Sequence, residues 1–211
     1  MLLFILSWCL IGVFAADYTL PGDCPNVKLQ ENLDYTKFSG LWYNVASYNS
    51  DGREIYDCAT LDFQEDNLGY TFKETYVEVV EGNRTQKMYQ ARVDPTFDAG
   101  NNAQFIMSHE AGDKVLQFPF FILSTDYDGY AIAYTCKWLK QKERKHYVHA
   151  WVLTRSKERL EGALLKKVED TISKYTDLAE HRQSFVFKDF SDASCAYSNK
   201  LDTDFFTTVF W

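Results

Sequence analysis

The side chains most able to do chemistry in this 211-residue chain are four histidines and five cysteines. His146 and His149 lie three residues apart in a predicted strand. Because successive strand side chains point to opposite faces, these two imidazoles could not chelate one metal ion. The sequence also contains no Gly-x-Ser-x-Gly motif and no phosphate-binding loop. We therefore expect no catalytic residue and no metal site, and we expect His149 to be a wall residue rather than a haem ligand.

Residues 1–16 have the features of a secretory signal peptide. They contain no charged side chain, their apolar run is too short to span a bilayer, and Val13 and Ala15 suit a cleavage site. Cys9 would leave with this segment. Four cysteines in an oxidising compartment predict two disulfides, and the spacing alone leaves three pairings open. The four that remain are Cys24, Cys58, Cys136 and Cys195.

Charge and composition exclude whole classes of protein. Asp and Glu number 30 against 22 Lys and Arg, for a net charge of −8, so the surface should repel nucleic acid. The 14 Tyr, 16 Phe and 5 Trp need a core or a cavity that buries them. The sequon Asn83-Arg84-Thr85 predicts a glycosylation site at Asn83. We expect a secreted, extracellular glycoprotein with no transmembrane segment.

The pattern from Gly40 to Thr154 predicts an all-β fold. Strand-length runs rich in Tyr, Phe, Val, Ile and Thr alternate with seven short polar turns, which indicates eight antiparallel strands in up-and-down order. Leucines and valines at helical spacing between residues 160 and 172 predict one helix, with Ser156 as its N-cap. We expect an eight-stranded barrel over residues 17–199, with this C-terminal helix packed outside.

Three separated motifs make the sequence resemble the lipocalins over most of its length. They are Gly40-Leu41-Trp42-Tyr43, Thr125-Asp126-Tyr127 with Tyr130 after it, and Arg155. The resemblance implies a structural closed end rather than a catalytic one. Trp42 would plug the barrel, Arg155 would lie over its ring, and the Thr-Asp pair would cap a tight turn. The expected closed-end residues are Gly40, Trp42, Thr125, Asp126, Tyr130 and Arg155.

Further stretches resemble the insect bilin-binding lipocalins of the insecticyanin type. They are Cys24-Pro25-Asn26-Val27-Lys28, Tyr134-Thr135-Cys136-Lys137-Trp138 and Phe190-Ser191-Asp192-Ala193-Ser194-Cys195. This resemblance implies the disulfides Cys24–Cys136 and Cys58–Cys195. It also implies biliverdin or a related bilin as a non-covalently bound cofactor.

The expected pocket follows from strand alternation. With Trp42 inward, Asn44 and Ala46 should share its face. The resemblance implies further inner rows, which also include Ala91 and Trp151. Inward acidic and basic groups would be costly in a dry interior, which favours an open cavity over a solid core. The expected ligand-binding residues are Asn44, Glu74, Tyr76, Tyr89, Met107, His109, Leu116, Phe118, Phe120, Thr135, Lys137, Tyr147 and His149.

The turn at residues 140–145 is basic in an acidic protein, and Lys137 and His146 flank it. Two interpretations have equal weight: a cationic rim that attracts an anionic ligand, and a solvated hairpin tip. Residues 200–211 depart from the family pattern. Packing on the barrel, homo-oligomerisation and contact with a membrane surface are all open for this tail.

The sequence thus predicts a carrier of a small hydrophobic ligand, first of all a bilin used for coloration. One alternative is a carrier of retinoid, carotenoid, sterol or fatty acid, as in apolipoprotein-D-like lipocalins. A second is an interaction protein whose barrel is filled by side chains. An isomerase of the prostaglandin type would need an inward free cysteine, and all four remaining cysteines are assigned to disulfides. We therefore expect no enzyme.

Overall fold

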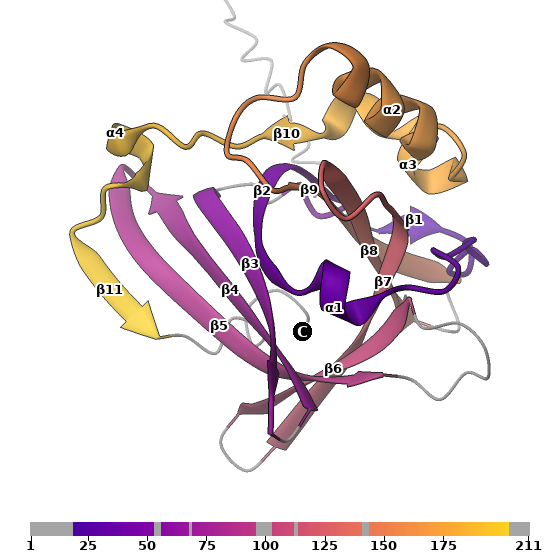
Figure 1. Cartoon of the computed structure of the whole chain (residues 1–211), viewed down its shortest axis with the longest axis horizontal. Coiled ribbons are helices and arrows are strands. Elements are labelled where there is room, and N and C mark those ends of the chain that lie inside the picture. The colour runs from indigo at the N-terminus through magenta and orange to yellow at the C-terminus, as the bar shows by residue number, and fades with distance from the viewer. Residues whose placement is uncertain are drawn as a thin grey trace, which may run out of the picture.

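The computed structural model describes residues 19–52, 56–67, 69–95, 103–111, 114–140 and 144–202. The predicted signal peptide and Cys9 lie outside this part of the chain. Eight antiparallel strands run up and down, each paired with the next, and the last pairs with the first to close a barrel (Figure 1). The predicted fold class is therefore confirmed. The strands are β2 (Gly40–Asn49), β3 (Tyr56–Asp66), β4 (Gly69–Val80), β5 (Asn83–Pro95), β6 (Gln104–Ala111), β7 (Lys114–Thr125), β8 (Tyr130–Lys140) and β9 (Lys145–Thr154).

Short elements surround the barrel, and α2 is the longest of the helices (Figure 1). No helix in the described part of the chain is long and apolar enough to cross a membrane. The helical elements are α1 (Tyr35–Phe38), α2 (Gly162–Ile172), α3 (Thr176–Glu180), the 3-10 turn η2 (Arg182–Ser184) and α4 (Asp192–Cys195). The short strands are β1 (Leu20–Pro21), β10 (Val186–Phe187) and β11 (Asn199–Asp202).

Helix α2 packs outside the barrel as expected, because its apolar side chains fall on one face. Val168 and Ile172 are buried against the outer face of the sheet. The predicted N-cap is wrong, since α2 begins only after Glu161. The Ser156 hydroxyl instead accepts a hydrogen bond from the Glu158 N–H, in a bend that follows β9.

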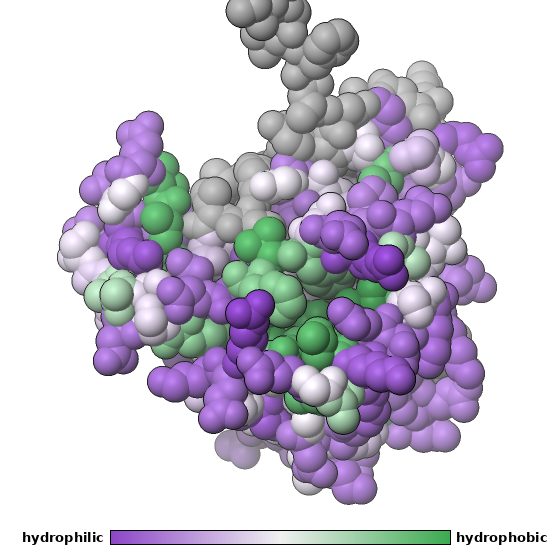
Figure 2. All heavy atoms as spheres, turned by 90° about the horizontal axis from the view of Figure 1, so that it is seen from above, coloured by the Kyte–Doolittle hydropathy of each residue, from purple (hydrophilic) through white to green (hydrophobic). Residues whose placement is uncertain are grey.

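The barrel wall separates two apolar cores. Inward side chains such as Trp42 and Phe120 form one core within the barrel. Outward side chains such as Ile132 and Val152 form the other, together with Leu160 and Val168 from the segment outside. Seen from above, hydrophobic residues gather in the middle of the molecular face and hydrophilic ones border them (Figure 2).

A bulge in β2 overturns one predicted inward position. The register with β9 shifts between Asn44 and Ala46, so the alternation of side chains changes phase there. Asn44 is inward as expected, but Ala46 joins the outer core and Ser47 takes the inner face. Simple alternation from Trp42 misplaced Ala46 because it assumes an uninterrupted ladder.

The barrel wall is divided at two places. Strand β3 pairs with β2 only along Gly40–Tyr43, and β6 pairs with β5 only along Arg92–Pro95. Two C-terminal segments occupy the exposed edges: β10 pairs with β2, and β11 pairs in parallel with β5. Strand β11 includes residues 200–202, the start of the predicted tail, so these residues add to the sheet, and residues 203–211 lie outside the described part.

Both disulfides join the partners that the resemblance implies. Cys24 bonds to Cys136 on β8, across 112 residues of sequence. Cys58 on β3 bonds to Cys195 on α4, across 137 residues. The second bond fixes what we call the C-terminal strap, residues 185–198, which runs over the outside of the barrel (Figure 1).

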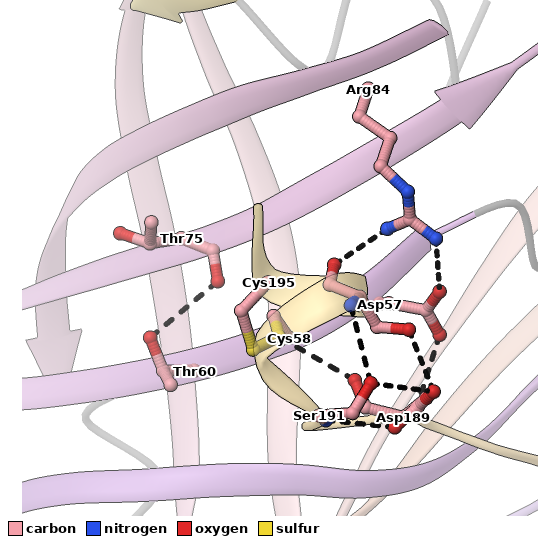
Figure 3. The surroundings of a disulfide bond; sticks show 9 residues. Asp57, Cys58, Thr60, Thr75, Arg84, Asp189, Ser191 and Cys195 are labelled. Carbon is pink, nitrogen blue, oxygen red and sulfur yellow. Dashed lines mark hydrogen bonds and ion pairs between the residues drawn. A yellow bond between two sulfur atoms is a disulfide. The ribbon is translucent and has the colours of Figure 1, made fainter. Parts of the chain in front are cut away.

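Polar contacts hold the strap beside this second disulfide (Figure 3). The Asp57 carboxylate accepts a hydrogen bond from the Asp189 N–H at 3.2 Å. The Arg84 guanidinium donates to the Ser194 carbonyl at 2.6 Å and lies 3.8 Å from the Asp57 carboxylate. Because Arg84 belongs to β5, the strap is tied to both sides of β4.

Candidate ligand-binding site

The closed end of the barrel is built around Trp42, which is fully buried. The Arg155 guanidinium lies 3.7 Å from the centre of the Trp42 ring, and the indole N–H donates to the Phe38 carbonyl at 2.8 Å. Arg155 also donates to main-chain carbonyls at 2.9 to 3.2 Å. These carbonyls belong to Lys37, Phe38, Ser39, Leu41 and Tyr127.

The turn between β7 and β8 closes the same end. The Thr125 hydroxyl donates to the Tyr130 carbonyl, and the Asp126 carboxylate accepts from the Gly129 and Tyr130 N–H groups. Lys167 of α2 donates to Asp126 at 2.8 Å. Partial burial raises the pKa of Asp126, but the hydrogen bonds from Lys167, Tyr130 and Gly129 together hold it below the usual range. These residues are structural, because each is used within the turn or its tie to α2.

Aromatic side chains line the inside of the barrel next to Trp42. Phe63 contacts Phe38 with ring centres 5.0 Å apart and Phe72 at 5.1 Å. Phe120 lies 5.7 Å from Phe72 and 5.3 Å from Trp151. Such tilted and edge-on contacts are the arrangements that aromatic rings prefer. They give the site an apolar floor that suits a flat, conjugated ligand.

The structure brings most of the predicted ligand-binding residues together on the inner face. Where the side chains of these residues are described, they are buried, except that Lys137 is half-buried. The Thr135 hydroxyl donates a hydrogen bond to the Pro119 carbonyl of the barrel wall. The side chains of two predicted residues, His109 and Leu116, lie outside the described part. The residues that are brought together are Asn44, Glu74, Tyr76, Tyr89, Met107, Phe118, Phe120, Thr135, Lys137, Tyr147 and His149.

Two buried polar atoms on the inner face have no hydrogen-bond partner in the described structure: Asn44 Oδ1 and Trp151 Nε1. One is an acceptor and the other a donor. A buried polar group without a partner costs about 1–3 kcal/mol. A ligand that carries both N–H donors and carbonyl acceptors would satisfy both atoms. This donor and acceptor set fits a bilin, whose pyrrole N–H groups and lactam carbonyls offer both kinds of partner.

His149 is a neutral wall residue in this site. Burial, and to a smaller extent the positive charge of Lys188, lower the pKa of His149 to about 3. Its ring stacks on Trp151 with centres 3.9 Å apart. Burial also raises the pKa of Tyr76 and of Tyr89 far above the usual range, and the charge of Glu74 adds to it. The imidazole and both phenols therefore stay uncharged at neutral pH.

The open end lies opposite Trp42, at the turns that join β4 to β5 and β8 to β9. Glu78 and Lys87 form an ion pair of 3.3 Å there. Lys137 is half-buried, and burial lowers its pKa. Residues 141–143 of the basic turn lie outside the described part, and Arg144 pairs with Asp23 at 2.8 Å. The cationic rim therefore stays a prediction.

His146 does not belong to the inner face. Its imidazole contacts the Gly22 carbonyl at 3.1 Å and the Asp177 carboxylate at 3.2 Å, both outside the barrel. His146 and His149 thus point to opposite faces of β9, as alternation predicted. No cluster of three metal-ligating side chains occurs among the described residues.

Three polar residues near Asn44 were not predicted from the sequence: Ser47, Tyr56 and Lys188. The Tyr56 hydroxyl lies 2.9 Å from Ser47 Oγ and accepts a long hydrogen bond of 3.4 Å from Asn44 Nδ2. The Lys188 ammonium lies 3.7 Å from the centre of the Tyr56 ring. No sequence signal marks the bulge that turns Ser47 inward, and Lys188 lies outside the eight strands.

Comparisons with known proteins agree with this architecture. The profile described as Lipocalin / cytosolic fatty-acid binding protein family matches residues 39–180. Insecticyanin-B of Manduca sexta is 28% identical over 184 residues, which cover 87% of each chain. Bilin-binding protein of Pieris brassicae is 27% identical over 198 residues, which cover 93% of this chain and 99% of that protein.

A solved structure matches as well. Insecticyanin from the tobacco hornworm superimposes with a TM-score of 0.75 at 26% sequence identity. The match covers 87% of this chain and 95% of that one.

Proposed function

We propose that this chain, which belongs to the lipocalin / cytosolic fatty-acid binding protein family, is a secreted carrier of biliverdin or a related bilin. Members of this family are carriers of small hydrophobic ligands and not enzymes. The two disulfides support a site of action in an oxidising compartment. The likeness to insecticyanin-B and to bilin-binding protein supports a bilin as the ligand. Coloration would be the use of such a pigment complex.

One observation carries the proposal. An aromatic barrel holds a buried acceptor, Asn44 Oδ1, and a buried donor, Trp151 Nε1, and neither atom has a partner in the described structure. A purely apolar ligand would leave both atoms unsatisfied. A bilin offers N–H groups to Asn44 and a carbonyl to Trp151, while its conjugated surface contacts the aromatic floor. The ligand-binding residues predicted from the sequence remain the proposed set.

A neutral lipid carrier is the second candidate, and Met107, Phe118 and Phe120 favour it. These apolar side chains are all buried on the inner face. A retinoid or sterol would bury its apolar surface against them, and this burial would favour binding by about 25 cal/mol of free energy per Å² of apolar area. Such a ligand would gain little from the two polar atoms.

An absorption titration separates the candidates. We expect biliverdin added to the purified protein to produce a shifted red band that saturates at one equivalent. Trp151→Phe should weaken this binding, whereas Trp138→Phe, which changes an exposed outer ring, should leave it unchanged. If the protein leaves the absorption spectrum of biliverdin unchanged but binds retinol at one equivalent, the second candidate would be established instead. Binding of neither ligand would overturn both.

A further inference from the structure

We propose that Lys188 of the C-terminal strap is the cation that binds a carboxylate of the ligand in the barrel. The inference rests on the proposed function, because it names a chemical group that the same site recognises. It adds a contact from outside the eight strands, and it identifies the ligand class as a carboxylic acid. Four features of the structure support it.

The first is the split in the barrel wall between β2 and β3. The two strands pair only along Gly40–Tyr43, and the last pair, Tyr43 with Thr60, is where they diverge towards the open end. The strap fills this split with main-chain hydrogen bonds to both strands. The Lys188 N–H donates to the Val45 carbonyl of β2 at 3.0 Å, and the Cys58 N–H of β3 donates to the Asp189 carbonyl at 3.1 Å. Lys188 therefore takes the place of a wall residue.

The second feature is the direction of the side chain. Phe187 lies opposite Ala46, which is on the outer face, and the Phe187 ring is 49% exposed. Alternation along the strap sends the next side chain, Lys188, to the inner face. Lys188 is 9% exposed, an unusual value for a lysine, and this agrees with the inward direction.

The third feature is the position of the ammonium group. It lies 3.7 Å from the centre of the Tyr56 ring, and the Tyr56 hydroxyl contacts Ser47 on the inner face. Asn44, whose Oδ1 has no partner in the described structure, belongs to the same group. The charge of Lys188 also helps to lower the pKa of His149 on β9. The Lys188 ammonium therefore lies beside the polar side chains of the proposed site.

The fourth feature is chemical. An ionic contact is stronger where water is excluded, because the effective dielectric constant is lower there. Glu74 is buried on the same inner face, so the site holds both signs of charge. Lys137 is half-buried nearer the open end and is a rival cation, whereas Lys87 is paired with Glu78. A ligand with a carboxylate and N–H donors, such as a bilin with its propionates, would match both signs.

The test compares an acid with its neutral derivative. Biliverdin and biliverdin dimethyl ester share the chromophore and differ in the two carboxylates. We expect the wild-type protein to bind the acid about 10- to 100-fold more tightly than the ester, the value of a hydrogen bond to a charged group. Equal affinity for acid and ester would overturn the role of Lys188 and leave the bilin carrier intact. If no bilin binds, retinoic acid and retinol form the same comparison.

Variants then identify the cation. We expect Lys188→Met to abolish the preference for the acid and to leave the affinity for the ester unchanged. Lys188→Arg, which keeps the charge, should keep part of the preference. Lys166→Met is the control, because it changes an exposed lysine of α2 outside the barrel, and it should retain the full preference. Lys137→Met tests the rival cation and should lower the preference less than Lys188→Met does. A loss of the preference in Lys137→Met as large as in Lys188→Met, or equal weakening of acid and ester in Lys188→Met, would overturn the proposal.

Two measurements make the test independent of misfolding. Circular dichroism and the melting temperature check that Lys188→Met is folded, since Tyr56 loses its cation. The wild-type ratio of acid to ester affinity requires no variant at all. If the protein binds neither the bilins nor the retinoids, the proposed function and this inference both fail.

Discussion

The Arg155 guanidinium lies 3.7 Å from the centre of the Trp42 ring and closes one end of the barrel. Trp42 also holds α1, because its indole N–H donates to the Phe38 carbonyl. Trp42 lies near the start of β2, and Arg155 directly follows β9. The two residues are 113 positions apart in the sequence. Their contact is therefore one of the long-range interactions that hold the closed end of the barrel together.

Trp42→Ala should lower the free energy of unfolding by about 3–5 kcal/mol, the range for truncating a large buried aromatic side chain. Urea denaturation monitored by circular dichroism measures it. The control is Trp138→Ala, which removes a ring that is 50% exposed on the outer face. Equal losses in the two variants would contradict the assignment of the closed end.

Asn44→Leu should change stability and binding in opposite directions. The ligand-free protein should become more stable by about 1 kcal/mol, because a buried acceptor without a partner is removed, whereas the hydrogen bond that is lost, from Asn44 Nδ2 to the Tyr56 hydroxyl, is long at 3.4 Å. Affinity for biliverdin should fall about tenfold, because the ligand loses the same acceptor. Thermal denaturation and the absorption titration measure the two effects.

Asn49→Leu is the matched control for that variant. Asn49 is also buried, but its Oδ1 accepts from the Asp51 N–H at 3.0 Å. The same substitution should therefore destabilise the protein at position 49. Stabilisation at both positions would show that the missing partner at Asn44 is not the cause.

The stability of the protein should depend on His149 below pH 6.5. The pKa of His149 is about 3 in the folded chain, whereas an unperturbed histidine, as in the unfolded chain, has a pKa of 6.5. As the pH falls, the unfolded state therefore binds this proton first. Stability is fully present above pH 6.5 and is lost progressively towards pH 3. The slope from this one group approaches about 1.4 kcal/mol per pH unit.

His149→Gln isolates this contribution. Urea denaturation between pH 6.5 and 4.5 should show a shallower slope for the variant, since carboxylates in the unfolded chain titrate mainly below this window. His181→Gln is the control, because that imidazole is only partly buried and lies outside the barrel. An unchanged slope in His149→Gln would contradict the buried, neutral imidazole.

Removal of either disulfide should reduce stability by a similar amount. The chain-entropy model gives about 4–5 kcal/mol for loops of more than 100 residues. We expect the Cys58→Ala/Cys195→Ala and Cys24→Ala/Cys136→Ala variants to melt at similarly reduced temperatures. Only the Cys58–Cys195 disulfide fixes the strap, so only the Cys58→Ala/Cys195→Ala variant should also lose the preference for an acidic ligand. Loss of that preference in both variants would contradict its dependence on the strap.

The closed end and the strand order could be predicted because their signals are local. Gly40 to Tyr43, the Thr125-Asp126 turn and Arg155 each have a recognisable motif, and short polar turns mark the strand ends. The structure places these residues where the motifs indicated.

The polar part of the site could be predicted only in part, for two physical reasons. The bulge between Asn44 and Ala46 changes the alternation without a glycine or proline to signal it. Lys188 meets the wall through its main-chain hydrogen bond to Val45, in a strap that a disulfide across 137 residues fixes, and no local pattern encodes such a contact. Register within a strand is readable from sequence, but register shifts and non-local insertions are not.

The location of Lys188 outside the family-matching residues 39–180 has a consequence for engineering. The aromatic floor and the proposed charge are encoded in separate parts of the sequence, which the Cys58–Cys195 disulfide and the hydrogen bonds of the strap hold together. A replacement of residues 186–190 could therefore exchange the charge in the pocket while every barrel strand is retained. Ligand selectivity in this protein would then be a modular property, adjustable by grafting a short segment onto an unchanged scaffold.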